Sequence, residues 1–300
     1  MARVGAFKSM VNRSAPYMLA GPAVLVIGFG CLYPTLLALR LGMEQWSLGT
    51  PWSSATYVGL SAFGLALTDP VVLHSFGVTL AFAAVVVGCE MLLGTALALL
   101  LEQPMRGMAV FRTIFIAPMM VAPIVVGMMW RYLFDTQYGF ANYLIGLVGI
   151  GPQTWLGDPV LAFAAIVLSD VWQWTPFVLI MVLAGLQNID QSALEAARID
   201  GATPLQAILR VKLPMLASVL VVTALMRLID AFRVLEVIYA LTFGGPGNAT
   251  EVLPVLIYKT AFVSQKLGTA SAISVLLLLV VSALSVAALA ISNPMRDGRR

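Results

Sequence analysis

Four ionisable residues stand at intervals of three within one apolar stretch of the chain. Arg227, Asp230, Arg233 and Glu236 alternate in sign, and residues three apart are neighbours on a helix, so successive pairs can neutralise one another. A continuous helix would turn this row by about half a revolution from first to last, so we expect that the four do not all face one cavity. Structural ion pairing is one interpretation of the row, and gating or substrate contact is the other. Glu90 is a further ionisable residue inside an apolar stretch.

A second group combines aromatic and polar side chains. Asp170, Trp172 and Trp174 lie close together, and Tyr239 stands near the end of the stretch that carries the charged row. Aromatic faces with a few convergent polar groups suit a sugar, although Trp and Tyr also anchor proteins at membrane interfaces. Trp172 and Trp174 are about 200° apart on a helix, so we expect at most one of them on a substrate pathway. The candidate pathway residues are Asp170, Trp172, Trp174, Arg227, Asp230 and Tyr239.

The sequence contains no arrangement typical of an enzyme. No metal-ligand pair, nucleophile elbow or His–carboxylate set occurs, so we expect neither a catalytic nor a metal site. The glycine-rich segment 244–248 lacks the Gly-Lys-Ser/Thr ending of a phosphate loop. We therefore expect no cofactor bound by this chain.

The composition is that of a membrane protein. Of the 300 residues, 60% are hydrophobic and only 10% are charged, and the mean hydropathy is +0.95. These values exclude a soluble globular enzyme, a disordered chain and a nucleic-acid binder. A spanning helix needs about 20 mostly apolar residues, and six stretches qualify. We predict an all-α polytopic membrane protein with six transmembrane helices, at about 17–39, 75–100, 114–134, 160–186, 216–241 and 269–292.

The basic residues predict the orientation of these helices. Eleven of the 17 fall in segments on one side of the predicted spans: Arg3, Lys8, Arg13, Arg106, Arg112, Arg198, Arg210, Lys212, Arg296, Arg299 and Arg300. Only Arg40, Arg131, Lys259 and Lys266 fall on the other side. The positive-inside rule then places both termini in the cytoplasm. The predicted organisation is a cytoplasmic segment 1–16, a six-helix domain 17–292 and a cytoplasmic tail 293–300.

The polar segment 187–215 between the fourth and fifth spans is the longest predicted cytoplasmic connection. Ser192 and Glu195 have the spacing of a capping box, and Thr203 with Gln206 repeats that spacing around a proline. Gly201 between them is typical of a helix stop. We predict two short helices that carry exposed apolar residues and suit docking onto a soluble partner. These apolar residues are Leu194, Ile199, Leu205, Ile208 and Leu209.

The same segment resembles a known motif. Glu195-Ala196-Ala197, then Gly201, then Val211 and Leu213-Pro214 have the spacing of the "EAA" loop of ABC-importer permeases, with Val211 in place of isoleucine. The stretch 241–246, Leu-Thr-Phe-Gly-Gly-Pro, resembles the outer loop of the maltose-type, F-like sugar permeases. Unlike the maltose protein itself, this chain has six predicted spans and no large external insertion, which favours the compact members of that branch.

The resemblance implies a mechanism and a set of partners. The EAA loop would be a coupling helix between spans four and five that inserts into a cytoplasmic ATPase dimer, which binds ATP and Mg. Glu195 would make the charged contact, Ala196 and Ala197 would allow close approach, and Gly201 would permit the turn. The coupling set is Glu195, Ala196, Ala197, Asp200, Gly201, Leu213 and Pro214, and the outer-loop set is Gly244, Gly245 and Pro246.

The further partners implied are a second permease, an external solute-binding protein, membrane lipid and a sugar, oligosaccharide or polyol, with no nucleic acid. The protein would then be a non-catalytic, multi-pass subunit in a bacterial or archaeal cell membrane. The alternatives are an ABC permease for a non-sugar solute such as glycerol phosphate, or a secondary transporter or channel, which leaves the cytoplasmic loop unexplained.

Overall fold

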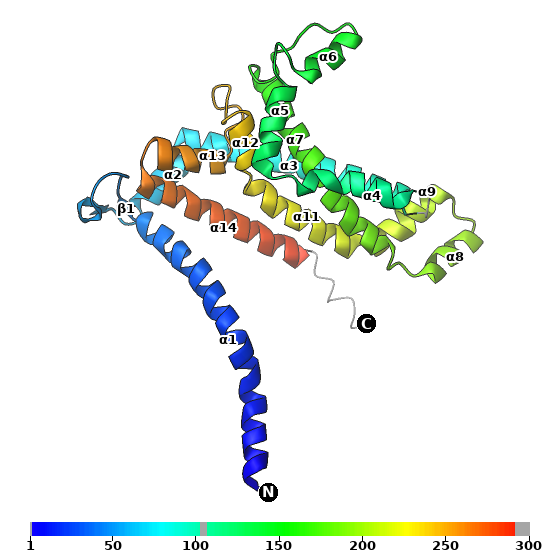
Figure 1. Ribbon diagram of the computed structural model, residues 1–300, viewed down its shortest axis with the longest axis horizontal. Helices are drawn as coiled ribbons and strands as arrows, with labels where there is room; N and C mark the ends of the chain where they lie inside the picture. Colours follow the sequence, from blue (N-terminus) through cyan, green and yellow to red (C-terminus); the bar gives the residue numbers. More distant parts are fainter. Residues whose placement is uncertain (1, 103–106, 292–300) are drawn as a thin grey trace. The chain divides into compact units, whose positions relative to one another are not determined.

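The computed structural model describes residues 2–102 and 107–291, and its described part is mostly helical (Figure 1). The predicted tail 293–300 lies outside the described residues. The chain divides into two compact units, one formed by Met1–Leu67 and Lys259–Leu276 and the other by Thr68–Tyr258 and Leu277–Arg300.

The first unit is built from the N-terminal helix and a small hairpin. Helix α1 covers Ala2–Leu41, strands β1 (Glu44–Gln45) and β2 (Thr56–Tyr57) pair antiparallel, and a 3₁₀ turn at Trp52–Ser54 lies between them. Helix α2 (Ser61–Thr68), a π-helical turn at Lys259–Val263 and the start of α14 (Leu267–Ile291) complete the unit. Both Arg40 and the Trp52 indole donate hydrogen bonds to the Glu44 carboxylate, at 3.2 and 3.1 Å. This hairpin has no counterpart in the sequence prediction.

The second unit holds the remaining helices. They are α3 (Pro70–Leu100), α4 (Met108–Ile116), α5 (Pro123–Leu133), α6 (Phe140–Leu147), α7 (Pro159–Leu186), α8 (Gln191–Ile199), α9 (Pro204–Ala207), α10 (Leu213–Met215), α11 (Ala217–Phe232), α12 (Glu236–Leu241) and α13 (Leu253–Tyr258), together with the later part of α14. A 3₁₀ turn follows α4 at Ala117–Met120, and a π-helical turn lies between α9 and α10 at Ile208–Lys212.

Within the described residues, four continuous helices are long and apolar enough to cross a membrane: Ala20–Leu41, Pro70–Leu100, Pro159–Leu186 and Leu267–Ala287. Two bent pairs raise the number to as many as six. The pair Thr113–Met120 and Pro123–Leu133 bends by 102°, and the pair Pro204–Met215 and Ala217–Phe232 bends by 68°.

Two of the predicted spans are broken rather than continuous. In the span 114–134, Pro118 and Pro123 remove backbone donors and interrupt the helix. The span 216–241 ends as α11 at Phe232 and resumes as α12 at Glu236. No proline or glycine lies at this second break, where α12 packs against α5 (Figure 1).

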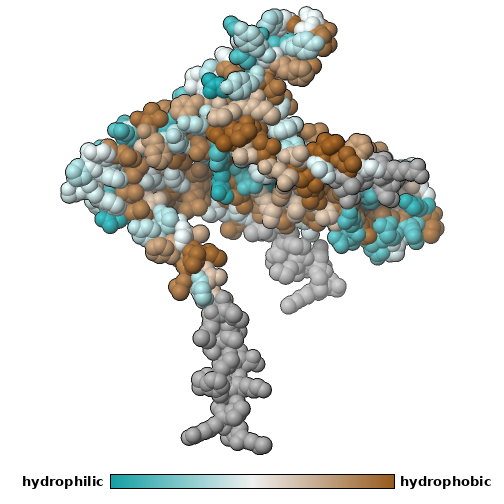
Figure 2. Space-filling model, viewed as in Figure 1, coloured by the Kyte–Doolittle hydropathy of each residue, from teal (hydrophilic) through white to brown (hydrophobic). Residues whose placement is uncertain are grey.

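The core of the second unit forms where α7 packs along α3. Gly94 of α3 permits this approach, since a Cβ there would lie 2.6 Å from the Val178 Cβ. One buried cluster includes Phe82, Ile166 and Phe232, and another surrounds Val182 near the segment 187–215. Figure 2 shows hydrophobic residues over much of this unit and hydrophilic ones gathered over the α8–α9 end.

Candidate functional site

Three helices bring an arginine and two carboxylates together in the interior. Arg227 of α11, Glu90 of α3 and Asp170 of α7 are at most 2% exposed. Arg227 donates from Nε to Glu90 Oε2 at 2.7 Å and from Nη2 to Glu90 Oε1 at 2.9 Å. Nη2 also donates to Asp170 Oδ1 at 3.0 Å. The fork geometry of the guanidinium thus links α3, α7 and α11 through charge-assisted hydrogen bonds.

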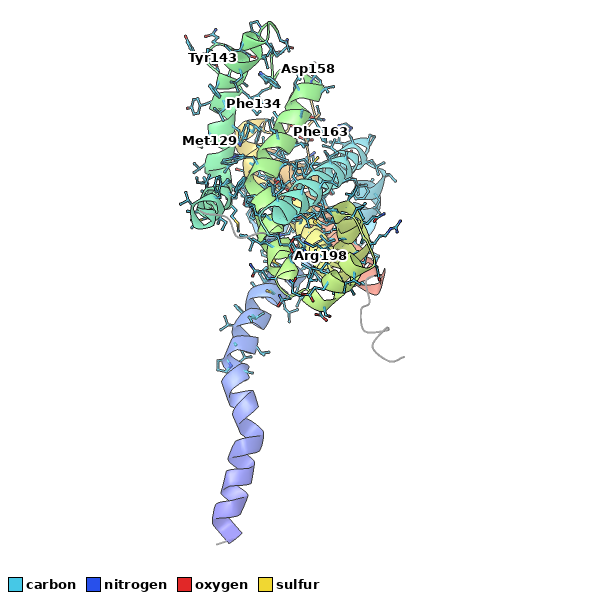
Figure 3. All side chains as sticks on the ribbon, turned by 90° about the vertical axis from the view of Figure 1, so that its right-hand side faces the viewer. Met129, Phe134, Tyr143, Asp158, Phe163 and Arg198 are labelled. Atoms are coloured by element: carbon cyan, nitrogen blue, oxygen red, sulfur yellow. The ribbon has the colours of Figure 1, made fainter. Side chains whose placement is uncertain are left out.

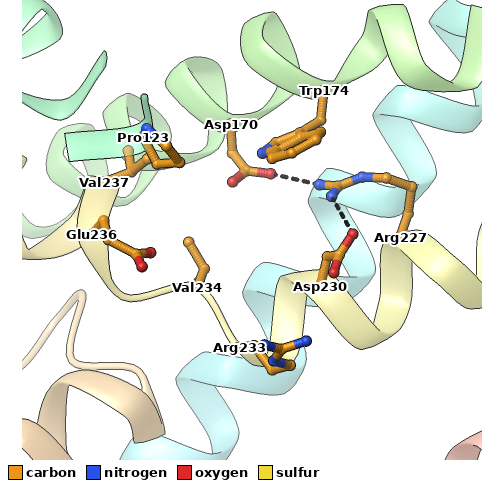
Figure 4. Close-up of a pocket in the computed structure, with 9 residues that line it drawn as sticks. All are labelled: Pro123, Asp170, Trp174, Arg227, Asp230, Arg233, Val234, Glu236 and Val237. Carbon is orange, nitrogen blue, oxygen red and sulfur yellow. Dashed lines mark hydrogen bonds and ion pairs between the residues drawn. The ribbon is translucent and has the colours of Figure 1, made fainter. Parts of the chain in front are cut away.

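The arginine also faces an open pocket of about 190 Å³ (Figure 4). The Trp174 ring lies over the guanidinium, with 4.8 Å between the Arg227 Cζ and the ring centroid. Arg227 Nη1 has no hydrogen-bond partner, and Asp230 Oδ2 lies 3.6 Å from it. This N–H group is buried, and its ion pair with Asp230 directs the guanidinium toward a carboxylate that lines the pocket. The lining residues are Pro123, Asp170, Trp174, Arg227, Asp230, Arg233, Val234, Glu236 and Val237.

The expectation that the charged row cannot share one cavity is wrong. Arg227, Asp230, Arg233 and Glu236 all line this pocket. The expectation assumed a continuous helix, whereas α11 ends at Phe232 and α12 begins at Glu236. The break redirects the second half of the row toward the first. Figure 4 shows the four side chains around one space.

Two of the other predicted pathway residues lie elsewhere. Trp172 lines an apolar pocket between α4 and α7, and its ring meets Trp130 edge-on, with 5.9 Å between centroids. Of the two tryptophans, only Trp174 lines the charged pocket, as the 200° separation predicts. Tyr239 lies outside that pocket, with its ring 5.1 Å from both Phe243 and Tyr258. Glu90 is not among the candidate pathway residues predicted from the sequence. The sequence marks it only as a single carboxylate inside an apolar stretch.

The segment 187–215 folds into two short helices, as predicted, but the first cap differs. The N-cap of α8 is Asp190, whose side chain accepts from the Ser192 backbone N–H at 2.9 Å. The predicted capping box of Ser192 and Glu195 is therefore wrong, because Ser192 lies inside the helix. Hydrogen bonds from the Ser192 hydroxyl and N–H hold the pKa of Asp190 below its usual value. Glu195 and Ala196 are exposed, and Ala197 is half-buried.

The turn and the second helix match the sequence prediction. Gly201 adopts a φ of +80°, a conformation that favours glycine. Thr203 and Gln206 form a complete capping box, with Pro204 in the first turn. Asp200 is the C-cap of α8, and Leu213 and Pro214 lie in α10 after the π-helical turn.

Of the apolar residues predicted to be exposed, Ile199, Leu205 and Leu209 are exposed, whereas Ile208 is half-buried. The prediction that Leu194 is exposed is wrong. Leu194 is 6% exposed and packs into the cluster with Val182 and Leu216. This contact ties α8 to the ends of the long helices. Figure 3 shows Arg198 of α8 far from Tyr143 of α6 and from Asp158, the N-cap of α7.

The glycine-rich segment forms a compact loop after α12. Thr250 Oγ1 donates to the Gly245 carbonyl at 2.7 Å, and the Gly244 N–H donates to Thr242 Oγ1 at 3.2 Å. Gly244 has a φ of +84°. On the far side of the loop, His74 Nε2 of α3 lies 3.0 Å from the Asn248 carbonyl oxygen. The loop containing Gly244, Gly245 and Pro246 is therefore held against α3.

Comparison with known proteins shows the family of this chain. The family of binding-protein-dependent transport system inner membrane components matches residues 90–296. The chain belongs to this family. It is a multi-pass inner-membrane permease of an ABC importer.

The relatives are similar over almost their whole length. The trehalose/maltose permease MalF of Thermococcus litoralis is 35% identical, with 90% of this chain and 95% of the relative covered. The trehalose permease SugA of Mycobacterium tuberculosis is 34% identical, with 89% and 85% covered. The sn-glycerol-3-phosphate permease UgpA of Agrobacterium fabrum is 33% identical, with 91% and 93% covered.

A solved structure shares the fold of the permease. The structure of a bacterial alginate ABC transporter, in complex with a periplasmic protein that holds an alginate pentasaccharide, matches with a TM-score of 0.83. The identity is 19%, and 96% of this chain and 98% of that chain are covered.

Among the described residues of the permease, no group of three or more His, Cys, Asp or Glu is placed to hold a metal ion.

Proposed function

We propose that this permease, paired with a second permease, forms the translocation pathway for an uncharged sugar, oligosaccharide or polyol. An external binding protein would deliver the solute, and ATP hydrolysis with Mg on a separate ATPase dimer would drive import. The chain would cross a bacterial or archaeal cell membrane six times. The segment 1–16 and the tail 293–300 would then both lie in the cytoplasm. Relatives named for trehalose and maltose support the substrate class.

The pocket at the helix break carries the substrate proposal. It joins the Trp174 aromatic ring to the Arg227 guanidinium and to carboxylate oxygens of Asp170 and Asp230. A sugar ring presents C–H groups that suit an aromatic face and hydroxyl groups that both donate and accept hydrogen bonds. These side chains therefore provide complementary partners for a polyhydroxyl solute.

The charge of the pocket favours an uncharged solute over glycerol phosphate, the solute named for some relatives. Three lining carboxylates, of Asp170, Asp230 and Glu236, face two guanidinium groups, of Arg227 and Arg233. Two of the three Arg227 nitrogens are already bound to carboxylates. A phosphate would therefore meet excess negative charge, whereas an uncharged polyol would not.

The coupling proposal rests on the geometry of α8. Glu195 and Ile199 are exposed on this helix, while Leu194 on its other face packs into the cluster that includes Leu186 and Leu216. A rigid helix with one face buried in the permease can pass a displacement of its exposed face to α7 and α11. Asp200 and Gly201 would shape the turn, and Leu213 and Pro214 would begin the connection to α11.

The first experiment is affinity capture of this permease from its native membrane in mild detergent, followed by mass spectrometry. We expect a second permease and an ATPase with a Walker A motif. The captured complex, reconstituted in proteoliposomes with its binding protein, is then tested for ATP-driven uptake of labelled trehalose, maltose and glycerol 3-phosphate. Recovery of a homo-oligomer without ATPase, even after cross-linking, would refute the importer. Uptake of glycerol 3-phosphate alone would refute the substrate class.

The coupling role is tested with Glu195→Ala and the matched control Gln191→Ala, both on exposed positions of α8. We expect Glu195→Ala to lower ATPase recovery and uptake at unchanged membrane level. The control should behave as wild type. Equal uptake by the two variants would exclude the proposed contact.

A further inference from the structure

One face of α5 carries charged and aromatic residues that the inner pocket does not use. Arg131, Tyr132 and Asp135 follow Ile124 and Met128 at helical spacing, so all five lie along one side of α5 and its end. Tyr132 is 80% exposed. A face directed at lipid would be apolar, and charged groups on it mark a water-filled space or a protein contact.

This face of α5 forms a cleft with α12. The cleft has a volume of about 670 Å³ and is lined on the α12 side by Tyr239, Ala240 and Phe243. The volume falls within the range of about 300–1,000 Å³ that is common for small-molecule sites, whereas the inner pocket of about 190 Å³ is below it. The inner pocket is thus small for more than a part of an oligosaccharide.

Specific contacts hold the two walls of the cleft in place. Gly127 lets α5 approach α12 closely, since a Cβ there would lie 2.7 Å from the Ala240 Cβ. Arg131 Nη1 donates to the Ala240 carbonyl at 3.4 Å and so links the same two helices. The Asp135 carboxylate accepts from the backbone N–H groups of Gln137 and Tyr138, at 2.8 and 2.9 Å, which fixes its position at the cleft end.

Resting on the proposed function, we propose that this cleft is an outer saccharide subsite, distinct from the pocket around Arg227. A sugar ring would lie against Tyr132, with Tyr239 and Phe243 opposite, and its hydroxyl groups would bond to Arg131 and Asp135. Aromatic surface with a few fixed donors and acceptors is the chemistry that a polyhydroxyl ring requires. The permease would therefore favour a saccharide of two or more rings over a monosaccharide.

The transport test uses the complete reconstituted complex with labelled maltose and trehalose as probes. Tyr132→Ala removes the aromatic face, and Tyr138→Ala is the matched control, because Tyr138 is 90% exposed and does not line the cleft. We expect Tyr132→Ala to raise KM by about three- to tenfold with kcat little changed, the effect of losing one aromatic contact. Tyr132→Phe keeps the ring and should restore the wild-type KM. Equal KM values for the two alanine variants would overturn the subsite.

A second measurement reads occupancy directly. In a Cys31→Ser, Cys89→Ala background, which removes the native thiols, Tyr132→Cys is labelled with a membrane-impermeant maleimide. We expect maltose to slow labelling at position 132 and not in the Tyr138→Cys control. Labelling that maltose leaves unchanged would overturn the subsite, and so would no labelling at all, which would mean that another subunit covers this face. A wild-type complex that transports neither sugar would instead refute the proposed function, and the subsite with it.

Discussion

Replacement of Arg227 by methionine should strongly destabilise the permease. Methionine fills a similar volume but removes the guanidinium that binds both Glu90 and Asp170 in the interior. Both carboxylates are then left in a region where their exposed fractions are 0% and 2%. An uncompensated buried charge costs far more than the net worth of the original pair.

The magnitude follows from burial and geometry. Removal of one partner of a buried, hydrogen-bonded ion pair typically costs about 3–5 kcal/mol. Arg233→Met is the matched control, because Arg233 lines the same pocket but is exposed, and an exposed pair is worth about 0–1 kcal/mol. The double variant Glu90→Gln with Arg227→Met should lose less stability than the sum of the single losses, since the stranded charge on Glu90 is gone.

The assay is reversible unfolding of the purified permease in mixed micelles with increasing SDS, followed by far-ultraviolet circular dichroism. The free energy of unfolding is compared among five proteins: wild type, Arg227→Met, Arg233→Met, Glu90→Gln and the double variant. Loss of less than about 1 kcal/mol in Arg227→Met, or strict additivity with Glu90→Gln, would refute the view that this buried network stabilises the fold.

Thr203→Ala removes the hydroxyl that caps α9 and should cost about 0.5–2 kcal/mol, seen as faster hydrogen–deuterium exchange in this turn; Thr203→Ser should retain protection, and equal exchange in both would contradict the capping role. Gly127→Val should force α5 away from α12 and lower stability by about 1–3 kcal/mol in the same unfolding assay, whereas Gly146→Val meets open space and should stay near wild type. The first turn of α8 should fray in acid. Hydrogen bonds from Ser192 lower the pKa of Asp190 in the folded state. The stability that the Asp190 cap adds to α8 is therefore fully present above the usual pKa of an aspartate, and it is lost as the pH falls through the lowered pKa of the folded state. Hydrogen exchange of α8 below about pH 4 measures this loss, and no change between pH 7 and pH 2 would contradict it.

Local sequence was enough to predict most of the segment 187–215. Thr203, Pro204 and Gln206 predict a capped helix because the hydrogen bonds of a capping box join residues only three apart. Gly201 predicts a turn because a positive φ favours glycine. The error at α8 is also local, since Asp190 and Ser192 are both good N-caps and the chain uses the earlier one.

The site depends instead on contacts between distant segments. Arg227 and Glu90 are 137 residues apart, and Arg227 and Asp170 are 57 apart. No periodicity in one stretch reveals which carboxylate an arginine will meet. The sequence indicated only that a buried ionisable group needs a partner.

Composition and local hydrogen bonding were enough to predict the helical membrane class, the approximate places of the apolar stretches and the two short helices of the segment 187–215. The break inside the span 216–241, by contrast, became visible only with the packing of the helices. The packing of α12 against α5 at Gly127 accompanies the break between Phe232 and Glu236. That break brings the row from Arg227 to Glu236 into one pocket, because side-chain direction follows the helix axis and the axis is set by what the helix packs against.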